Sequence, residues 1–172
     1  MAFGNISGYQ GGANCSNLER VEGSDGQVYL KIYNNTGSAL ANGAIKTLAF
    51  LIDATDTANP IIKGVVVAPA TATNSIVVVV DNGELGAASI VDKDYGFVCV
   101  QGYCQALCNG GTAIAAGDQL KVANGGTAFI QSVSGNGSAI AVATCAIAFE
   151  AYATGTDALK KVYLINKPST IA

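Results

Sequence analysis

Hydrophobic and polar positions alternate most regularly just after Gln27. The aliphatic members of this alternation are Val28, Leu30 and Ile32. A period of two is the pattern of a β-strand whose two faces meet different surroundings. The folded domain is therefore expected to begin here, with Tyr29 and Tyr33 on the outward face. Because tyrosine is enriched at protein–protein contacts, these two residues are expected to belong to an interface.

A longer patterned stretch covers Tyr95–Val122. Short apolar runs rich in β-forming residues are interrupted at Gly102, at Asn109-Gly110-Gly111 and at Gly117. These interruptions predict the series strand, tight turn, strand, glycine-rich loop, strand. We therefore expect this stretch to form the centre of a small β-domain.

Further strands are predicted on both sides of that stretch. The β-branched runs 60–68 and 75–80 are typical of strands buried on both faces, and a short polar turn at 69–74 joins them. Segments 138–152 and 158–165 complete the predicted strands. Residues 44–52 are also expected to form a strand. A helix over 38–51 is the alternative there, and Gly43 in its middle disfavours it.

Asparagine–glycine pairs recur along the chain and predict many sharp turns. The pair Asn124-Gly125 lies between two predicted strands, which is the strongest short signal of a β-hairpin. No α-helical periodicity of comparable strength is present. The pattern therefore indicates a strand-rich domain with many sharp turns.

Two loops are near copies of each other. Residues 37–43 and 111–117 share the form Gly-Ser/Thr-Ala-Leu/Ile-Ala-x-Gly, and each leads into a predicted strand. We expect the aliphatic residue of each loop to close the end of a barrel or sandwich. The final glycine is expected to supply a positive φ. Two such loops indicate either a repeated way of entering a strand or a coincidence in a chain rich in Ala and Gly, so a duplicated domain is not predicted.

The two ends of the chain lack these patterns. Residues 1–26 are rich in Gly, Asn and Ser, with isolated apolar side chains at Phe3, Ile6, Tyr9 and Leu18. Two interpretations stay open: a disordered tail, or an arm whose apolar side chains bind a neighbouring subunit. In the second interpretation Phe3, Ile6 and Tyr9 are candidate contact residues. The predicted organisation is an arm at 1–26, a β-rich domain at 27–166 and a short tail at 167–172.

The fold class predicted from these patterns is mainly β: a compact β-barrel, a β-tulip-like domain or a sandwich, with an extended N-terminal arm. The chain of 172 residues is 50% hydrophobic and only 12% charged, with 21 glycines. Such a composition suits closely packed sheets better than amphipathic helices. The length is sufficient for one main domain with a substantial core.

The charge distribution argues against two classes of partner. The formal net charge is −3, and the nine basic residues are scattered, so no basic patch is expected to bind nucleic acid directly. No apolar run approaches the roughly 20 residues that span a bilayer, and the first residues do not resemble a signal peptide. We therefore expect no membrane partner. We also expect the protein to be synthesised in a cytoplasm.

Five cysteines are present, at Cys15, Cys99, Cys104, Cys108 and Cys145. An odd number cannot pair completely within one chain, and cytoplasmic synthesis favours free thiols that act as small hydrophobic side chains. Cys104 and Cys108 lie on one face of a predicted strand, too far apart for a mutual disulfide. A metal site on Cys99, Cys104 and Cys108 is the alternative, but paired C-x-x-C motifs and histidine are lacking.

Catalytic motifs are not evident. The chain has no histidine, which removes the commonest general base and metal ligand. The loop 109–117 lacks the Gly-Lys-Ser/Thr ending of a phosphate loop. The carboxylates Asp53-x-x-Asp56 and Asp92-Lys-Asp94 have spacings that could help to bind calcium, but they lack alternating oxygen ligands and are better explained as solvated turns. We therefore expect no enzyme activity, no cofactor and no metal.

Five short motifs follow one another along about 27–165, in segments 34–43, 64–67, 96–107, 113–120 and 146–151. Their order resembles that of the head-decoration, or cement, proteins of tailed bacteriophages. In that family an Ala-x-Gly-Asp-x-Leu turn is frequent, as in Ala115–Leu120. A later Gly-x-Ala-x-Glu-Ala strand is also frequent, and here Ala146 takes the place of its first glycine.

This resemblance implies a compact β-barrel or β-tulip domain that binds the outside of an icosahedral capsid and reinforces the seams between capsomers, often as a trimer. The implied partners are the major capsid protein and further copies of this chain, and the implied location is the capsid exterior of the virion. Two other functions stay open. One is a small major capsid protein, which the short chain and the lack of a long amphipathic helix disfavour. The other is a ligand- or glycan-binding β-module of a virion fibre.

Overall fold

The computed structural model describes residues 18–23, 26–53, 61–69, 76–83, 86–122, 126–133 and 144–165. Within these ranges the chain is mainly β, with no α-helix, which confirms the predicted fold class. The strands are β1 Arg20–Glu22, β2 Val28–Tyr33, β3 Leu40–Ala41, β4 Ile45–Asp53, β5 Ile61–Val67, β6 Val77–Val80, β7 Ser89–Ile90, β8 Tyr95–Cys108, β9 Gln119–Val122, β10 Phe129–Val133, β11 Ala146–Ala148 and β12 Ala158–Leu164.

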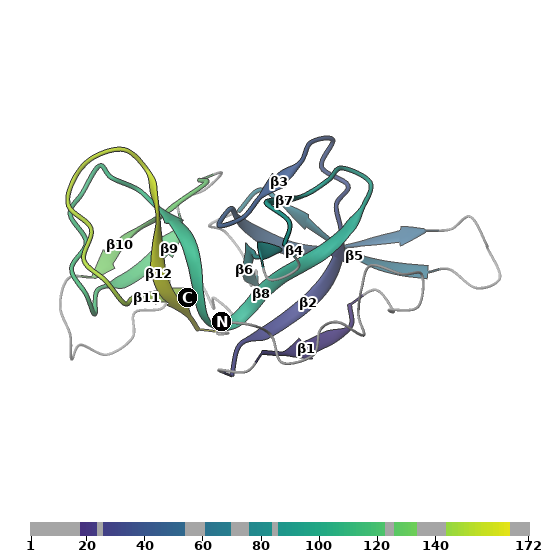
Figure 1. Cartoon of the computed structure of the whole chain (residues 1–172), viewed down its shortest axis with the longest axis horizontal. Helices are drawn as coiled ribbons and strands as arrows, with labels where there is room; N and C mark the ends of the chain where they lie inside the picture. The colour runs from purple at the N-terminus through teal and green to yellow at the C-terminus, as the bar shows by residue number, and fades with distance from the viewer. Residues whose placement is uncertain are drawn as a thin grey trace, which may run out of the picture.

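Strand β8 joins two lobes (Figure 1). Its first half, Tyr95–Gln101, pairs with β2, and its second half, Gly102–Cys108, pairs with β12. The tight turn predicted at Gly102 is therefore wrong, because the strand continues through it. Gly102 instead bends the strand at a φ of 95°, and a Cβ there would lie 3.0 Å from the Cα of Gln27. Only glycine satisfies both conditions without strain.

The C-terminal lobe, formed by the second half of β8 and by β9–β12, is a closed five-stranded barrel. Its strands follow the order β10-β9-β11-β12-β8, and Phe129 of β10 pairs with Cys108 of β8 to close it. The Asn109 N–H donates to the Phe129 carbonyl at 2.8 Å next to this closure. The interior is filled by Cys104, Ala106, Cys108, Ile114, Leu120, Phe129, Ala146, Ala148, Val162 and Leu164.

The N-terminal lobe, formed by β1–β7 and the first half of β8, has the strand order β5-β4-β6-β8-β2, with β1 paired to the outer edge of β2. Its core contains Val28, Ile32, Leu40, Val66, Val78, Val80, Ile90, Val98 and Val100. Among the described residues β2 and β5 approach without forming a ladder, so this lobe is an open version of the C-terminal barrel. Arg20–Glu22, which sequence analysis placed in the N-terminal arm, form β1 and extend the folded region.

The two lobes repeat one design. Numbered along the chain without the short strands β1, β3 and β7, the five main strands of each lobe lie in the order third, second, fourth, fifth, first. Strand β8 is the fifth strand of the first lobe and the first strand of the second. The sequence similarity is confined to the two copied loops, so this duplication was not predicted. It follows from the strand order and from the matching contacts of those loops.

The two loops have matching backbone hydrogen bonds. The Gly43 N–H donates to the Val80 carbonyl, and the Gly117 N–H donates to the Ala148 carbonyl, each at 2.8 Å. Both glycines have a positive φ, 81° and 89°, as predicted. The aliphatic residues that precede them were expected to close a barrel end. Leu40 and Ile114 are both buried, since each is 3% exposed and each belongs to a core cluster.

The remaining strand predictions are confirmed in part. Segment 158–165 forms β12, whereas the described residues 144–152 of the predicted strand 138–152 form a strand only at Ala146–Ala148. Residues 45–52 lie in β4 and residue 44 directly precedes it, so the predicted strand is confirmed and the alternative helix is wrong. Strand β6 is buried on both faces, whereas β5 leaves Ile62 and Val67 exposed, so the expectation of full burial is wrong for β5. Strands β9 and β10 pair as the predicted hairpin. The turn residues Asn124-Gly125 lie outside the described residues, as do 134–143 and the tail 167–172.

Candidate functional site

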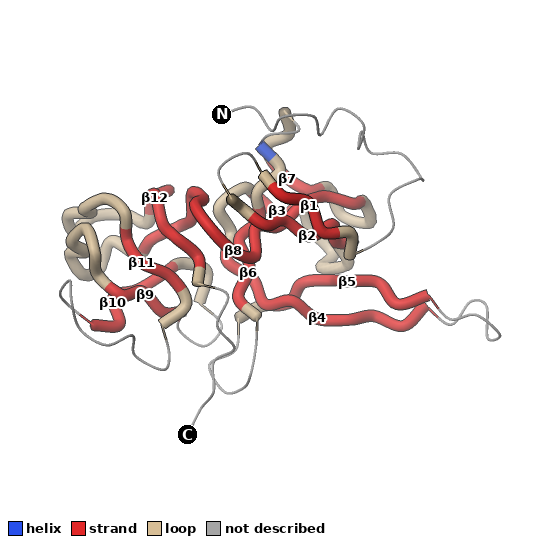
Figure 2. The backbone as a smooth tube through the Cα atoms, turned by 90° about the horizontal axis from the view of Figure 1, so that it is seen from below, coloured by secondary structure: helices blue, strands red, loops and turns tan. Residues whose placement is uncertain are grey.

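The β4–β5 hairpin projects from the body of the N-terminal lobe (Figures 1 and 2). Phe50 pairs with Gly64, and Ile52 pairs with Ile62. Because directly paired residues of an antiparallel ladder share one face, Phe50, Ile52 and Ile62 lie on the same side of the hairpin. Their exposed fractions are 63%, 65% and 56%. We call these three side chains the hairpin face.

The hairpin face continues the core of the lobe outward. Leu48 and Val66 form the next pair inward, and both pack in the N-terminal core. Strand β6 pairs with β4 only from Ile45 to Thr47, so the sheet is wide at the body and only two strands wide further out. A two-stranded ribbon with exposed apolar residues is a surface that favours contact with another chain or segment.

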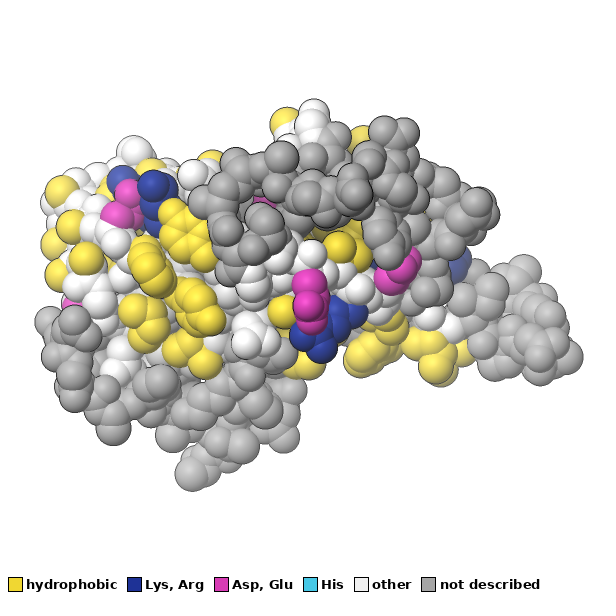
Figure 3. Space-filling model, turned by 60° about the horizontal axis from the view of Figure 1, so that its bottom comes forward, with side chains coloured by type: hydrophobic (Ala, Val, Ile, Leu, Met, Phe, Trp, Pro, Cys, Tyr) yellow, Lys and Arg dark blue, Asp and Glu magenta, His cyan; other side chains and the backbone are white. Residues whose placement is uncertain are grey.

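A second apolar surface lies on the outside of the C-terminal barrel. The Tyr103 and Phe149 rings are 5.5 Å apart in an edge-to-face arrangement, and the Phe149 and Tyr163 rings are 6.1 Å apart. We call these three residues the aromatic patch. Phe149 and Tyr163 are exposed. Figure 3 shows hydrophobic side chains gathered over this lobe, with others toward the β4–β5 end. Aromatic residues of this kind are enriched at protein interfaces.

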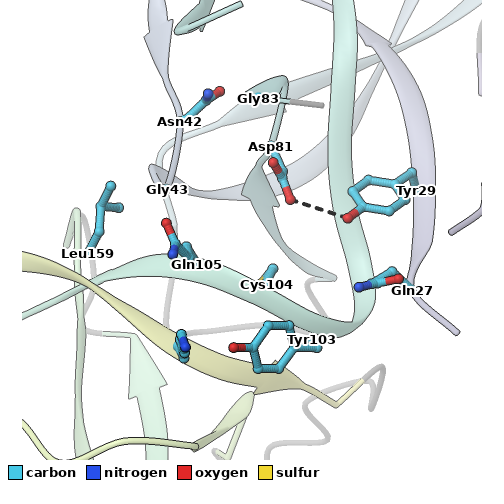
Figure 4. A pocket seen from close by; sticks show the side chains of 11 residues that line it. Gln27, Tyr29, Asn42, Gly43, Asp81, Gly83, Tyr103, Cys104, Gln105 and Leu159 are labelled. Atoms are coloured by element: carbon cyan, nitrogen blue, oxygen red, sulfur yellow. Dashed lines mark hydrogen bonds between the residues drawn. The ribbon is translucent and has the colours of Figure 1, made fainter. Parts of the chain in front are cut away.

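A cleft of about 390 Å³ lies between the lobes (Figure 4). The N-terminal lobe contributes Gln27, Tyr29, Asn42, Gly43, Asp81 and Gly83, and the C-terminal lobe contributes Tyr103, Cys104, Gln105, Leu159 and Lys161. The Asn42 side chain makes two hydrogen bonds within the protein: its amide donates to the Ala87 carbonyl, and its oxygen accepts the Asn82 N–H. The cleft therefore offers an aromatic ring beside amide and charged side chains.

Tyr29 and Asp81 form the polar contact of the cleft. The Tyr29 hydroxyl donates to a carboxylate oxygen of Asp81 at 3.3 Å. Burial, together with the negative charge of Asp81, raises the pKa of Tyr29 well above its usual value. Tyr29 therefore keeps its proton at neutral pH and acts as a hydrogen-bond donor rather than as a base.

The described cysteines Cys99, Cys104, Cys108 and Cys145 are free thiols, as predicted. Two causes raise the pKa of Cys104 well above its usual range: first its hydrogen bond with Cys99, and second its burial. Burial raises the pKa of Cys108 to about 11 and also raises that of Cys145. Thiols that stay protonated are poor nucleophiles, so these side chains act in packing. Cys15 lies outside the described residues.

The residues expected at an interface have different outcomes. Phe3, Ile6 and Tyr9 lie outside the described residues. Tyr29 is 3% exposed and belongs to the core, so its expected position on an outward face is wrong. The alternation in β2 is real, but both faces of the strand are covered. Tyr33 is half-buried, with its ring 5.1 Å from that of Tyr95.

Sequence analysis missed the residues that the structure exposes. Phe50 and Ile52 are two residues apart in a predicted strand, so they were expected on one face, but Leu51 between them is also apolar and the pattern does not distinguish the two faces. Nothing in the sequence shows that the sheet narrows to two strands at these positions. The aromatic patch combines residues from β8, the end of β11 and β12, so only the barrel brings them together.

The candidate ion-binding carboxylates have structural roles where they are described. Asp92 accepts the Gly37 N–H at 2.9 Å, and Asp94 accepts the Tyr95 N–H at 2.7 Å. Within the described ranges no three His, Cys, Asp or Glu residues gather in a way that could hold a metal ion. Asp56 lies outside these ranges. The described part of the chain contains no helix that could span a membrane.

A comparison of the sequence with protein-family models and with curated proteins finds no match. Two of the short sequence motifs, 113–120 and 146–151, lie side by side in the fold. Ala146 pairs with Leu120, and the Asp118 carbonyl accepts the Ala148 N–H at 2.9 Å. The Asp118 carboxylate accepts the Ala115 N–H at 2.8 Å. Both motifs therefore contribute to the neighbouring strands β9 and β11 of the C-terminal barrel.

Proposed function

We propose that this protein is a capsid decoration protein, which binds the outer surface of a bacteriophage capsid and stabilises the contacts between capsomers. The observation that carries this proposal is the hairpin face: an exposed apolar surface on a hairpin that projects from the strand-built body. The order of motifs along the chain supports the same function by resemblance. The proposed partners are the major capsid protein and other copies of this chain, and the proposed location is the capsid exterior.

The size of the hairpin face suits a structural protein that is bound in many copies. Burying an exposed Phe or Ile side chain contributes about 1.5–3 kcal/mol, so three side chains that are about 60% exposed contribute roughly 4 kcal/mol. On its own, an interaction of that size corresponds to a dissociation constant on the order of 1 mM. Stable binding therefore needs a second contact, for which the aromatic patch is suitable, because linked contacts raise the effective concentration of one another.

Decoration in this way requires no chemical reaction at the protein surface. A protein that binds only the assembled shell stabilises that shell by mass action. If three copies associate around a symmetry axis of the shell, each gains further contacts. The proposed mechanism is therefore the simultaneous burial of several modest apolar surfaces between subunits of the shell.

The test is co-sedimentation of the purified protein with capsids that lack it. Wild-type protein is expected to sediment with the shells and to raise the temperature at which they break. The double variant Phe50→Ala, Ile52→Ala is expected to bind at least about tenfold more weakly. The control is Val91→Ala, which shortens a side chain of similar exposure that follows β7, outside the hairpin. Absence of wild-type binding, or equal loss in the control, would contradict the proposal.

A second function, ligand or glycan binding, is favoured by the cleft between the lobes. The Tyr103 ring beside Gln27, Gln105 and Asp81 resembles the combination of an aromatic platform with planar polar groups that suits a sugar ring. A glycan array distinguishes the two functions. Binding of a defined sugar that Tyr103→Ala abolishes, with no binding to capsids, would favour a fibre module over a decoration protein.

A further inference from the structure

The two lobes can be matched residue by residue, because their strands repeat the same backbone hydrogen bonds. The Asp81 N–H donates to the Phe97 carbonyl at 3.1 Å in the N-terminal lobe, and the Phe149 N–H donates to the Lys161 carbonyl at 2.9 Å in the C-terminal barrel. Asp81 and Phe149 each directly follow the residue whose carbonyl accepts the N–H of the last glycine in a copied loop. Phe149 is therefore the counterpart of Asp81, and Lys161 is the counterpart of Phe97.

The same matching extends to the whole aromatic patch. Successive side chains on one face of a strand are two residues apart. At the next position on the same faces of β8 and β12, Cys99 pairs with Tyr29 in the N-terminal lobe, and Tyr163 pairs with Tyr103 in the barrel. The aromatic patch is therefore the counterpart of a surface of the N-terminal lobe that consists of Tyr29, Asp81 and Cys99.

The surface in the N-terminal lobe is covered, whereas the aromatic patch is exposed. Tyr29 is 3% exposed and Cys99 is 0% exposed, and both belong to the core cluster that also fills the barrel. Phe149 is 56% exposed and Tyr163 is 40% exposed. The order of the lobes accounts for this difference, because the N-terminal lobe is followed by a second lobe and, within the described ranges, the barrel is not.

The barrel meets the N-terminal lobe through a pair of leucines on its outer surface. Leu107 of β8 pairs with Leu159 of β12, and we call these two residues the leucine pair. The Leu107 N–H donates to the Gly43 carbonyl at 2.9 Å, and the Leu159 side chain fills the space that a Cβ of Gly43 would need. The lack of a side chain at Gly43 therefore allows the two lobes to approach closely.

The N-terminal lobe carries its own version of the leucine pair. By the same matching, the counterparts of Leu107 and Leu159 are two tyrosines, Tyr33 and Tyr95. These two residues, which we call the tyrosine pair, are directly paired between β2 and β8, and their rings are 5.1 Å apart. Tyr95 is 39% exposed. The leucine pair is used in the joint between the lobes, whereas the tyrosine pair lies at the surface of the chain.

From this repeat we propose that a second copy of this chain binds the aromatic patch through its tyrosine pair, as the barrel binds the N-terminal lobe through the leucine pair. Gly117 then takes the place of Gly43. It lies next to the patch, because its N–H donates to the carbonyl of Ala148, directly before Phe149. Both surfaces are aromatic and partly exposed, a composition that is typical of protein interfaces.

The proposed contact joins two different surfaces, so it is heterologous. After one contact forms, the first copy still offers its tyrosine pair and the second copy still offers its aromatic patch. Association therefore continues until a ring closes, or it produces an open chain of copies if the rotation between neighbours does not close.

This contact specifies the part of the proposed function that names other copies of this chain as partners, and it rests on the proposed function in this respect alone. Copies that bind each other combine the contacts of their hairpin faces with the shell, which raises the occupancy of each. The contact is measured on the free protein without capsids. Its failure is therefore distinguishable from a failure of capsid binding, which co-sedimentation measures.

The experiment follows the mass of the free protein by sedimentation velocity over a range of concentrations. The wild type is expected to grow beyond a monomer as the concentration rises. Tyr95→Asp disrupts the tyrosine pair and Phe149→Asp disrupts the aromatic patch, so each variant alone is expected to lose association. An equal mixture of the two variants is expected to form a dimer and nothing larger, because each variant contributes one intact surface.

The matched control is Val67→Asp, which places the same charge on β5 at a side chain that is 46% exposed and belongs to neither surface. It is expected to associate as the wild type does. Three results would overturn the proposal: a wild type that stays a monomer at every soluble concentration, a mixture of the two variants that forms no dimer, or association of Tyr95→Asp alone. The last result would show that the aromatic patch binds a second aromatic patch.

A second measurement uses the wild type, in case a variant does not fold. Protein labelled with ¹⁵N is mixed with unlabelled protein and treated with an amine-reactive cross-linker. Lys161 lies on β12 beside the patch, and the Lys63 ammonium lies 4.9 Å from the ring centroid of Tyr33. Links between Lys161 of one copy and Lys63 of another are expected. Links between copies that join only Lys161 to Lys161, or no links between copies, would contradict the proposal.

Discussion

The repeated loops provide the most quantitative prediction about the fold. Leu40 and Ile114 lie in different core clusters. The cluster of Ile114 extends from the barrel into the N-terminal lobe, where it includes Tyr29 and Ile45, whereas the cluster of Leu40 lies within the N-terminal lobe. Leu40→Ala and Ile114→Val each remove atoms that the surrounding core cannot fully replace. If the two clusters pack independently, the effects of these two changes on stability should add.

The magnitudes follow from burial. Leu40 and Ile114 are each 3% exposed, so Leu40→Ala is expected to cost about 2–5 kcal/mol and Ile114→Val about 0.5–1.5 kcal/mol of the free energy of unfolding. For distant sites without shared contacts, the double variant should equal the sum of the single changes within about 0.5 kcal/mol. Urea unfolding followed by circular dichroism measures all four proteins of this cycle.

Two results would refute this reasoning. A cost below about 1 kcal/mol for Leu40→Ala would show that the loop residue does not close the core. An interaction energy well above about 0.5 kcal/mol in the double variant would show that the two clusters form one packing unit.

Three further predictions concern single residues. Gly102→Ala is expected to lower stability by about 1–3 kcal/mol, measured by urea unfolding, because its φ is positive and the backbone of Gln27 is close. Asn34→Ala is expected to cost about 1–3 kcal/mol in thermal unfolding, since the fully buried Asn34 amide donates to the Ser38 and Ile90 carbonyls at 2.8 and 3.0 Å. Stability is expected to fall as the pH rises from 9 to about 11, because the folded protein holds the Cys108 proton more tightly than the unfolded chain, whose thiol has a pKa of 9.0. Cys108→Ala should reduce this dependence in urea unfolding across that range, and an unchanged slope would contradict the assignment.

The features that were predicted correctly depend on local sequence. Gly43 and Gly117 were expected to have positive φ, and Leu40 and Ile114 were expected to be buried, because a short loop between strands limits both choices. The strand at Gly102 was not predicted correctly. A glycine with positive φ serves a tight turn and a bent strand equally well, and only the pairing of β8 with β2 and β12 distinguishes them.

The position of Tyr29 shows what the period of a strand cannot predict, which is the burial of each of its faces. Its alternation with Val28 and Leu30 correctly placed it on the opposite side of β2, but a period of two does not say what covers each side. In the fold one side faces the core of the N-terminal lobe, and the other faces the joint between the lobes. The hairpin face and the aromatic patch likewise depend on how far neighbouring strands extend, which the local pattern does not encode.

The central claim is that this protein binds the outside of a capsid and stabilises it. The most direct measurement is a cryo-electron microscopy reconstruction of the virion that contains this chain. The account expects density for the two lobes on the outer surface, at seams between capsomers, with the β4–β5 hairpin against the shell. Density for this chain only inside the shell, or only on a tail fibre, would contradict it.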